Sequence, residues 1–174
     1  ELKMLRVIKR LKAACGIEIK ATFLGAHAFP AEYKENHRAY IELIKNEMLP
    51  VIGKEGLADF IDVFCETNYY SVEEMEEILL EGKKYGLIPK VHVNQFTVLG
   101  GIRKAVELGA LSVDHLEELA DDDVLALKGI HTLKKLVLLL IFLQSHFLPF
   151  QATQYHELKP PLSRYNFSLK FLPC

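Results

Sequence analysis

The chain has 174 residues, enough for one domain with a sizeable hydrophobic core. Half of the residues are hydrophobic and a quarter are charged, a composition that excludes a disordered chain. The formal net charge of -2 gives no reason to expect nucleic acid or a membrane surface as a partner. The longest apolar run, 136–143, is far shorter than the roughly 20 residues that span a bilayer. The three cysteines form no CxxC pair, so we expect a cytoplasmic protein.

The charge changes sign near Lys128. Residues 129–174 contain five bases and one acid, a net charge of +4, which leaves 16 bases and 22 acids, or -6, before Gly129. Four of the seven prolines also fall after this point. We therefore predict a domain over 1–128 and a distinct C-terminal tail over 129–174.

Hydrophobic periodicity predicts alternating helices and strands over the first 128 residues. The predicted helices lie at about 1–14, 36–55, 71–86, 101–108 and 121–128. The predicted strands lie at about 17–25, 60–65, 89–94 and 111–115. The helix "SVEEMEEILLEGKKYG" carries the clearest signals, because Ser71 and Glu74 have the spacing of a capping box and Gly86 stops the pattern.

Strand–helix alternation with short connections predicts an α/β fold with parallel strands, adjacent in chain order. A doubly wound sheet and part of a (β/α)₈ barrel fit this pattern equally well, and periodicity does not separate them. No glycine-rich GxGxxG or GxxxxGK[ST] motif follows any of the predicted strands, which weakens a nucleotide-binding interpretation.

A histidine lies near the carboxyl end of three predicted strands: His27, His92 and His115. A single histidine at such a position is most often a satisfied polar group, but functional groups gather at this edge of parallel folds, and three repeats favour a site. Neutral imidazole is a good ligand for zinc or iron and can also move a proton. We expect the three side chains to converge on one cavity.

Strand alternation adds detail to this expectation. Leu111, Val113 and His115 should share one face, so the neighbouring Asp114 should face away and be structural. His92 and Asn94 should share a face. Gln95 has the opposite parity, and could reach the same site only if the strand leaves regular alternation.

Four segments, "TFLGAHAFPAEY", "ADFIDVFCETNYYSVEE", "PKVHVNQFT" and "GGIRKAVELGALSVDHLE", resemble the imidazolonepropionase family of the amidohydrolase superfamily. The resemblance implies a partial (β/α)₈ TIM barrel, with strands three to six and their outer helices over 1–128. It also implies a hydrolase that opens the lactam ring of 4-imidazolone-5-propanoate with a metal-activated water, giving N-formimidoyl-L-glutamate in histidine degradation. The implied cofactor is one zinc or iron ion, and a homodimer is a further expectation.

The resemblance also assigns roles to individual residues. His92 matches the metal-binding histidine of barrel strand five. His27 and Gln95 match positions that contact the substrate. His115 matches the strand-six histidine that polarises the scissile carbonyl or assists proton transfer, so we expect it to be catalytic.

Other features of the family are absent from the chain. A His-x-His pair on strand one and an aspartate on strand eight should supply further metal ligands, and neither is found. The resemblance ends near Lys128, which suggests that 129–174 are unrelated or frameshifted. We therefore expect the chain to be an incomplete, inactive imidazolonepropionase. The alternative is a non-catalytic α/β binding or assembly module that retains the barrel scaffold.

Overall fold

A computed structural model describes residues 1–128, and the prediction made for the tail at 129–174 lies outside them. The helices are α1 Leu2–Ala14, α2 His37–Leu43, α3 Leu49–Glu55, α4 Val72–Lys84, α5 Gly101–Glu107 and α6 Asp121–Lys128, with a 3₁₀ turn η1 at Ala31–Tyr33 and a π-helical turn η2 at Ile44–Met48. The strands are β1 Thr22–Ala26, β2 Phe60–Cys65, β3 Ile88–Val93 and β4 Ser112–His115.

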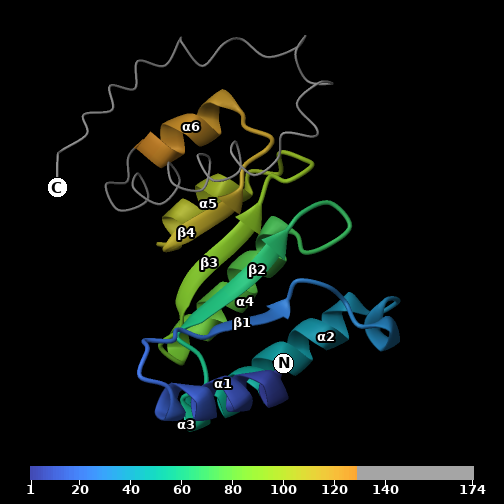
Figure 1. The fold of residues 1–174 in the computed structure, drawn as a ribbon. Helices are drawn as coiled ribbons and strands as arrows, with labels where there is room; N and C mark the ends of the chain where they lie inside the picture. Colours follow the sequence, from blue (N-terminus) through green and yellow to red (C-terminus); the bar gives the residue numbers. More distant parts are fainter. Residues whose placement is uncertain (129–174) are drawn as a thin grey trace, which may run out of the picture. The chain divides into compact units, whose positions relative to one another are not determined.

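The four strands form one parallel sheet in the order β1-β2-β3-β4, which confirms the predicted topology (Figure 1). The predicted first strand began too early. Ile17 is 70% exposed, and Ala21 gives its N–H to the Asp59 carboxylate rather than to a neighbouring strand. Pairing with β2 starts only at Thr22.

The long predicted helix over 36–55 is interrupted. It consists of α2 and α3 joined by the π-helical turn η2. Pro50 lies in the first turn of α3 and has no N–H to give to the preceding turn, which accounts for a break in the regular hydrogen-bond pattern at this place. The capping box at Ser71 and Glu74 is confirmed, since both of its hydrogen bonds are present.

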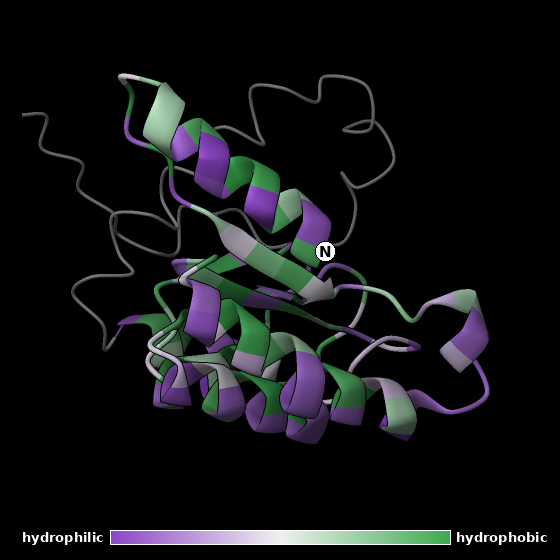
Figure 2. Cartoon of the chain, turned by 90° about the horizontal axis from the view of Figure 1, so that it is seen from below, coloured by the Kyte–Doolittle hydropathy of each residue, from purple (hydrophilic) through white to green (hydrophobic). Residues whose placement is uncertain are grey.

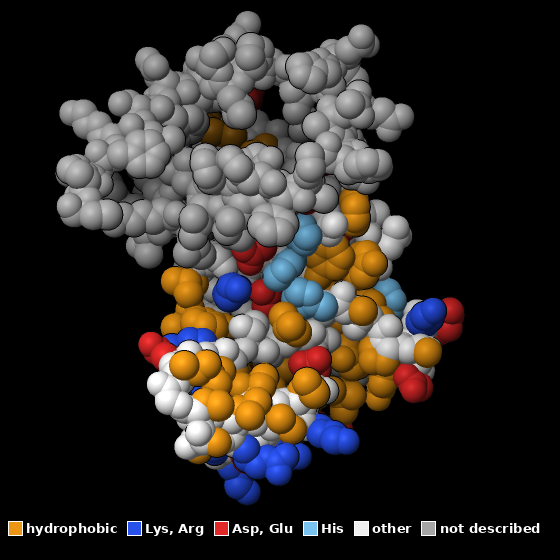
Figure 3. All heavy atoms as spheres, viewed as in Figure 1, with side chains coloured by type: hydrophobic (Ala, Val, Ile, Leu, Met, Phe, Trp, Pro, Cys, Tyr) orange, Lys and Arg blue, Asp and Glu red, His pale blue; other side chains and the backbone are white. Residues whose placement is uncertain are grey.

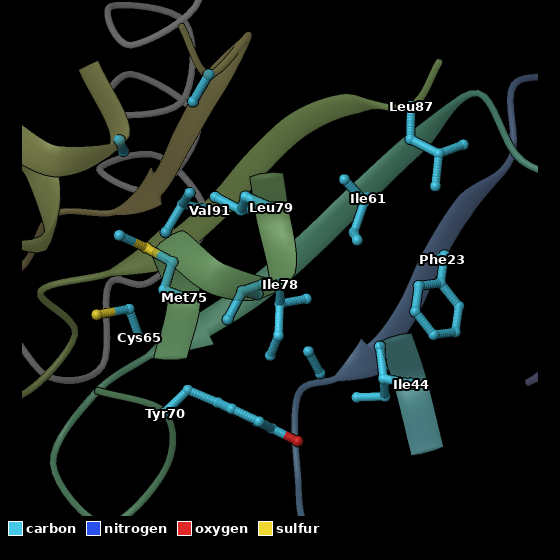
Figure 4. Packing of buried hydrophobic residues seen from close by; sticks show 14 of the residues in the cluster. Phe23, Ile44, Ile61, Cys65, Tyr70, Met75, Ile78, Leu79, Leu87 and Val91 are labelled. Atoms are coloured by element: carbon cyan, nitrogen blue, oxygen red, sulfur yellow. The ribbon is translucent and has the colours of Figure 1, made fainter. Parts of the chain in front are cut away.

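One face of the sheet is covered by helices. Phe23, Ile61 and Val93 lie on this face and meet the helix that follows their own strand: Figure 4 shows Phe23 beside Ile44 of η2, and Ile61 and Val93 approach glycines of α4 and α5. The helices show hydrophobic and hydrophilic stripes in Figure 2, as expected for elements with one buried side.

The other face of the sheet carries polar and aromatic side chains. Asp62 pairs in register with Lys90, and Phe64 with His92, so these four residues share that face. Because the helices after β1, β2 and β3 all pack on the apolar face, the arrangement differs from a doubly wound sheet and is consistent with a partial barrel. None of the helices within 1–128 is long and apolar enough to cross a membrane.

Candidate active site

Three histidines come together at the carboxyl edge of the sheet. His27 directly follows β1, His92 lies in β3, and His115 ends β4. The ring centroids of His27 and His92 are 4.7 Å apart, and those of His92 and His115 are 5.2 Å apart. Figure 3 shows pale-blue histidine side chains grouped on one face. The ring distances confirm that the three side chains converge, whereas the cavity expected between them stays a prediction.

The structure adds a residue that the sequence analysis missed. Asp62 of β2 has a side chain that is only 1% exposed, and its Oδ1 lies 2.9 Å from Nδ1 of His92. The same oxygen lies 3.3 Å from Nε2 of His27, although this second contact lacks hydrogen-bond geometry. A carboxylate inside the apolar run "DFIDVF" was the available signal, because a buried charge requires a partner.

Charge is concentrated at this cluster. Burial alone would raise the pKa of Asp62, but the contacts with His27 and His92 outweigh it and lower the pKa to about 2. Burial acts to lower the pKa of His92, and the neighbouring carboxylate of Asp62 raises it overall. The site therefore holds an ionised carboxylate beneath two imidazole rings, a combination that favours a bound cation.

His115 reaches the cluster because its backbone leaves strand geometry. Regular alternation would turn it toward the helices, since its register partner Val93 faces them. His115 has φ +81° and Leu116 has φ +65°, both in the left-handed region that costs a non-glycine residue about 1–3 kcal/mol. This local departure brings the His115 ring to the polar face.

The expectation for Asp114 was wrong for the same reason. Asp114 pairs in register with His92 and shares its face of the sheet. Its carboxylate lies 3.8 Å from the Lys90 ammonium, and its charge is among the influences that raise the pKa of His92. Asp114 is therefore part of the electrostatic surroundings of the site.

Gln95 lies in a bend just beyond β3, where alternation also ends. Asn94 has φ +55°, and its side-chain amide donates to the Glu118 carbonyl at 2.9 Å and to Asp123 at 3.1 Å. Asn94 thus points toward the start of α6. The prediction that it shares a face of the sheet with His92 was wrong. Gln95 is half-buried, and its expected contact with the substrate stays a prediction.

A second buried acid, Glu66, holds the turn that contains Gln95, and it too was missed. Its side chain accepts hydrogen bonds from the backbone N–H groups of Thr67 at 2.7 Å, Phe96 at 2.9 Å and Thr97 at 3.3 Å, and from the Thr97 hydroxyl. Burial acts to raise the pKa of Glu66, but these donors lower it overall. The carboxylate ties the turn after β2 to the turn after β3.

The residues at the cluster suit a metal ion. One donor atom each from His27, Asp62 and His92 lies within 4.8 Å of the others, so this group could hold a metal. Imidazole nitrogen and carboxylate oxygen are ligands that zinc and iron both accept. The Asp62 Oδ2 atom is buried and makes no hydrogen bond within 1–128. Its lone pairs are therefore available to a metal ion.

Sequence comparison finds close relatives for most of the chain. It is 65% identical over 133 residues to the imidazolonepropionase of Flavobacterium psychrophilum, covering 76% of this chain and 32% of the relative. The imidazolonepropionase of Flavobacterium johnsoniae is 58% identical over 133 residues, with the same shares of both chains covered. That of Thermoanaerobacter pseudethanolicus is 44% identical over 135 residues, which are 78% of this chain and 31% of the relative. These matches confirm the resemblance seen in the motifs. The chain spans about a third of the length of these curated relatives, and no family model matches it.

Proposed function

We propose that residues 1–128 form strands three to six of the barrel of an imidazolonepropionase, which opens 4-imidazolone-5-propanoate to N-formimidoyl-L-glutamate. The observation that carries the proposal is the meeting of His27, His92 and His115 at the carboxyl edge of a parallel sheet, with a buried carboxylate against the first two. The 65% identity to an imidazolonepropionase supports it independently.

In this proposal His92 binds a zinc or iron ion together with ligands from strands of the barrel outside residues 1–128. When bound, the metal supplies Lewis acidity, which makes water nucleophilic near neutral pH. A catalytic zinc normally takes three protein ligands, so the chain by itself should bind metal weakly and show no turnover.

The other histidines act on the substrate. His115 lies on the far side of His92 from His27 and takes the role of polarising the scissile carbonyl or moving the proton that ring opening requires. Its side chain is 25% exposed and can reach a bound molecule. His27 and Gln95 take the role of contacting the substrate.

The alternative is a non-catalytic α/β module that retains the scaffold for binding or assembly. Within 1–128, β1 and β4 form the two edges of the sheet, and open edges readily pair with another chain. A cytoplasmic location and a homodimer remain predictions.

A chimera distinguishes the two functions. Residues 1–128 would replace the aligned segment of the Flavobacterium psychrophilum imidazolonepropionase, which supplies the remainder of the barrel. The enzyme proposal predicts ring opening by the chimera, with strong loss of kcat on His115→Ala. The matched control is His37→Ala, a histidine that stacks on Phe29 away from the cluster. A folded, metal-loaded chimera without activity would instead favour the binding module.

A further inference from the structure

Asp62 lies beneath the histidine cluster and contacts two of its rings through one oxygen. Its Oδ1 atom is 2.9 Å from Nδ1 of His92 and 3.3 Å from Nε2 of His27. The Asp62 side chain is 1% exposed, whereas that of His92 is 28% exposed. The carboxylate is thus fixed in the interior, and the His92 ring, which contacts it through Nδ1, is the part of the pair that reaches the surface.

We propose that Asp62 is a positioning residue, which holds neutral His92 in the tautomer with its proton on Nδ1 and leaves Nε2 free to bind a metal ion. An ionised carboxylate can only accept hydrogen bonds, so Nδ1 must be the donor in this contact. A neutral imidazole carries one ring proton, and Nε2 then presents its lone pair. The tautomer follows from the contacts within this chain, whereas metal binding by Nε2 rests on the proposed function.

Direct binding of the metal by Asp62 is the competing arrangement, since donors of His27, Asp62 and His92 lie within 4.8 Å of one another. The Oδ1–Nδ1 distance of 2.9 Å is that of an N–H···O hydrogen bond. Two ligand atoms at about 2.0–2.1 Å from a tetrahedral zinc would lie roughly 3.3 Å apart. Oδ1 of Asp62 has this spacing to Nε2 of His27 but lies closer to Nδ1 of His92, so the hydrogen bond to His92 is the contact that direct binding would have to break. A catalytic ion also needs an open position for the substrate, and the exposed edge of His92 offers one where the buried carboxylate does not.

The same carboxylate couples two roles in the site. It holds His92, which is a metal ligand in the proposed function. It also lies 3.3 Å from His27, which contacts the substrate in that proposal. Histidine ligands of metal sites commonly donate their second ring N–H to a carboxylate, and losing that partner costs about 10–100-fold in metal affinity or activity. Asp62 meets this description by geometry.

Long-range ¹H–¹⁵N NMR of the 174-residue chain tests the tautomer directly. The spectrum is recorded above the pKa of His92, and the His92→Gln variant assigns its ring signals. We expect a protonated Nδ1 and an unprotonated Nε2 in His92. Finding the proton on Nε2 in the unsubstituted chain would overturn the inference.

Substitutions separate positioning from general structural support. Asp62→Ala should shift His92 toward the common tautomer with the proton on Nε2. Asp62→Asn keeps an oxygen acceptor without the charge and should shift the ring less, and it remains informative if the alanine variant does not fold. Asp114→Asn is the matched control, because Asp114 pairs in register with His92 yet makes no hydrogen bond to its ring. An unchanged tautomer in both Asp62 variants would also overturn the inference.

A zinc titration followed by the same NMR spectrum distinguishes an error in this inference from an error in the proposed function. The inference predicts that zinc shifts the Nε2 signal of His92 and leaves Nδ1 protonated. Loss of the Nδ1 proton on zinc binding would show direct binding at the Asp62 side and refute the positioning role. No shift in the zinc-loaded chimera, which supplies the remaining barrel, with the Nδ1 tautomer intact, would count against the proposed metal role of His92 alone.

Discussion

Glu66 and Phe96 are joined by a hydrogen bond of 2.9 Å from the Phe96 backbone N–H to the Glu66 side chain, which connects the turns after β2 and β3. Because Glu66 is only 2% exposed, Glu66→Ala would leave the N–H groups of Phe96 and Thr97 without their acceptor. We expect a loss of about 2–3 kcal/mol in the free energy of unfolding. Urea denaturation measures this loss, and hydrogen exchange should become faster at the same two amides.

Glu47→Ala is the control for this substitution, since Glu47 is an exposed glutamate in the π-helical turn. It should leave both the unfolding free energy and the exchange of the turn nearly unchanged. Unaltered exchange at Phe96 and Thr97 in the Glu66→Ala variant would show that the carboxylate does not hold the turn of Gln95.

Gly101 allows α5 to approach the sheet closely. A Cβ atom added there would lie 2.7 Å from Cγ2 of Val93 and 3.1 Å from Sγ of Cys65, both of them buried. Gly101→Ala should therefore destabilise the fold by about 1–3 kcal/mol, despite the better helix propensity of alanine. The double variant with Val93→Ala should lose less than the sum of the two single changes, as measured by thermal or urea unfolding.

Gly16→Ala provides the comparison, because an added Cβ at Gly16 meets nothing within 4 Å. Its unfolding free energy should change by less than about 0.5 kcal/mol. Equal stabilities of the Gly16 and Gly101 variants would contradict the tight packing of α5 on β3.

The cysteines Cys15 and Cys65 should differ strongly in reactivity. Burial, with smaller effects from nearby carboxylates, raises the pKa of the Cys65 thiol to about 12, whereas Cys15 is exposed. Because the thiolate is the reactive form, a disulfide reagent added to a Cys174→Ser background should label Cys15 quickly and Cys65 only after unfolding. Rapid labelling that survives Cys15→Ser in that background would show that Cys65 is not buried as described.

An ion-pair group on the helices should make stability depend on pH. Hydrogen bonds from Arg38 and Lys45 lower the pKa of Glu77 to about 2, against the opposing effect of burial. Its folded pKa lies below the ordinary value of 4.5, so its contribution is present above that value and is lost as pH falls toward about 2. Since the group is largely solvent-screened, we expect about 1 kcal/mol or less.

Denaturation at near-neutral pH and again below pH 4.5 measures this contribution. Glu77→Gln should remove it at the higher pH and flatten the pH dependence over the window, whereas Glu32→Gln, on the exposed η1 turn, should leave the slope unchanged. A Glu77→Gln slope equal to that of the unsubstituted chain would refute the role assigned to this network.

The parallel order of the sheet and the meeting of the three histidines followed from patterns that are local in sequence. Strand–helix alternation predicts parallel neighbours, and the carboxyl ends of such neighbours lie at one edge. Period-two alternation failed at Asn94 and His115 because both residues take left-handed backbone conformations, which a polar residue type alone does not reveal. The side assigned to Asp114 was wrong for this reason.

The missed acids show another limit. Asp62 and Glu66 lie in and directly after an apolar strand, where a sequence pattern indicates burial but does not name the partner. The partners are His92, 30 residues further along the chain, and the N–H of Phe96, also 30 residues away. Only the strand register brings them together, so the carboxylate beneath the histidines could be recognised only from the three-dimensional arrangement.

The proposed function assigns His92 of this chain to the metal centre of an imidazolonepropionase. An anomalous-difference map from crystals of the zinc-loaded chimera measures this most directly. We expect zinc at about 2.0–2.1 Å from Nε2 of His92, with Nδ1 still hydrogen-bonded to Asp62. Zinc bound in the barrel without a His92 ligand, or coordinated by Asp62 in place of His92, would contradict it.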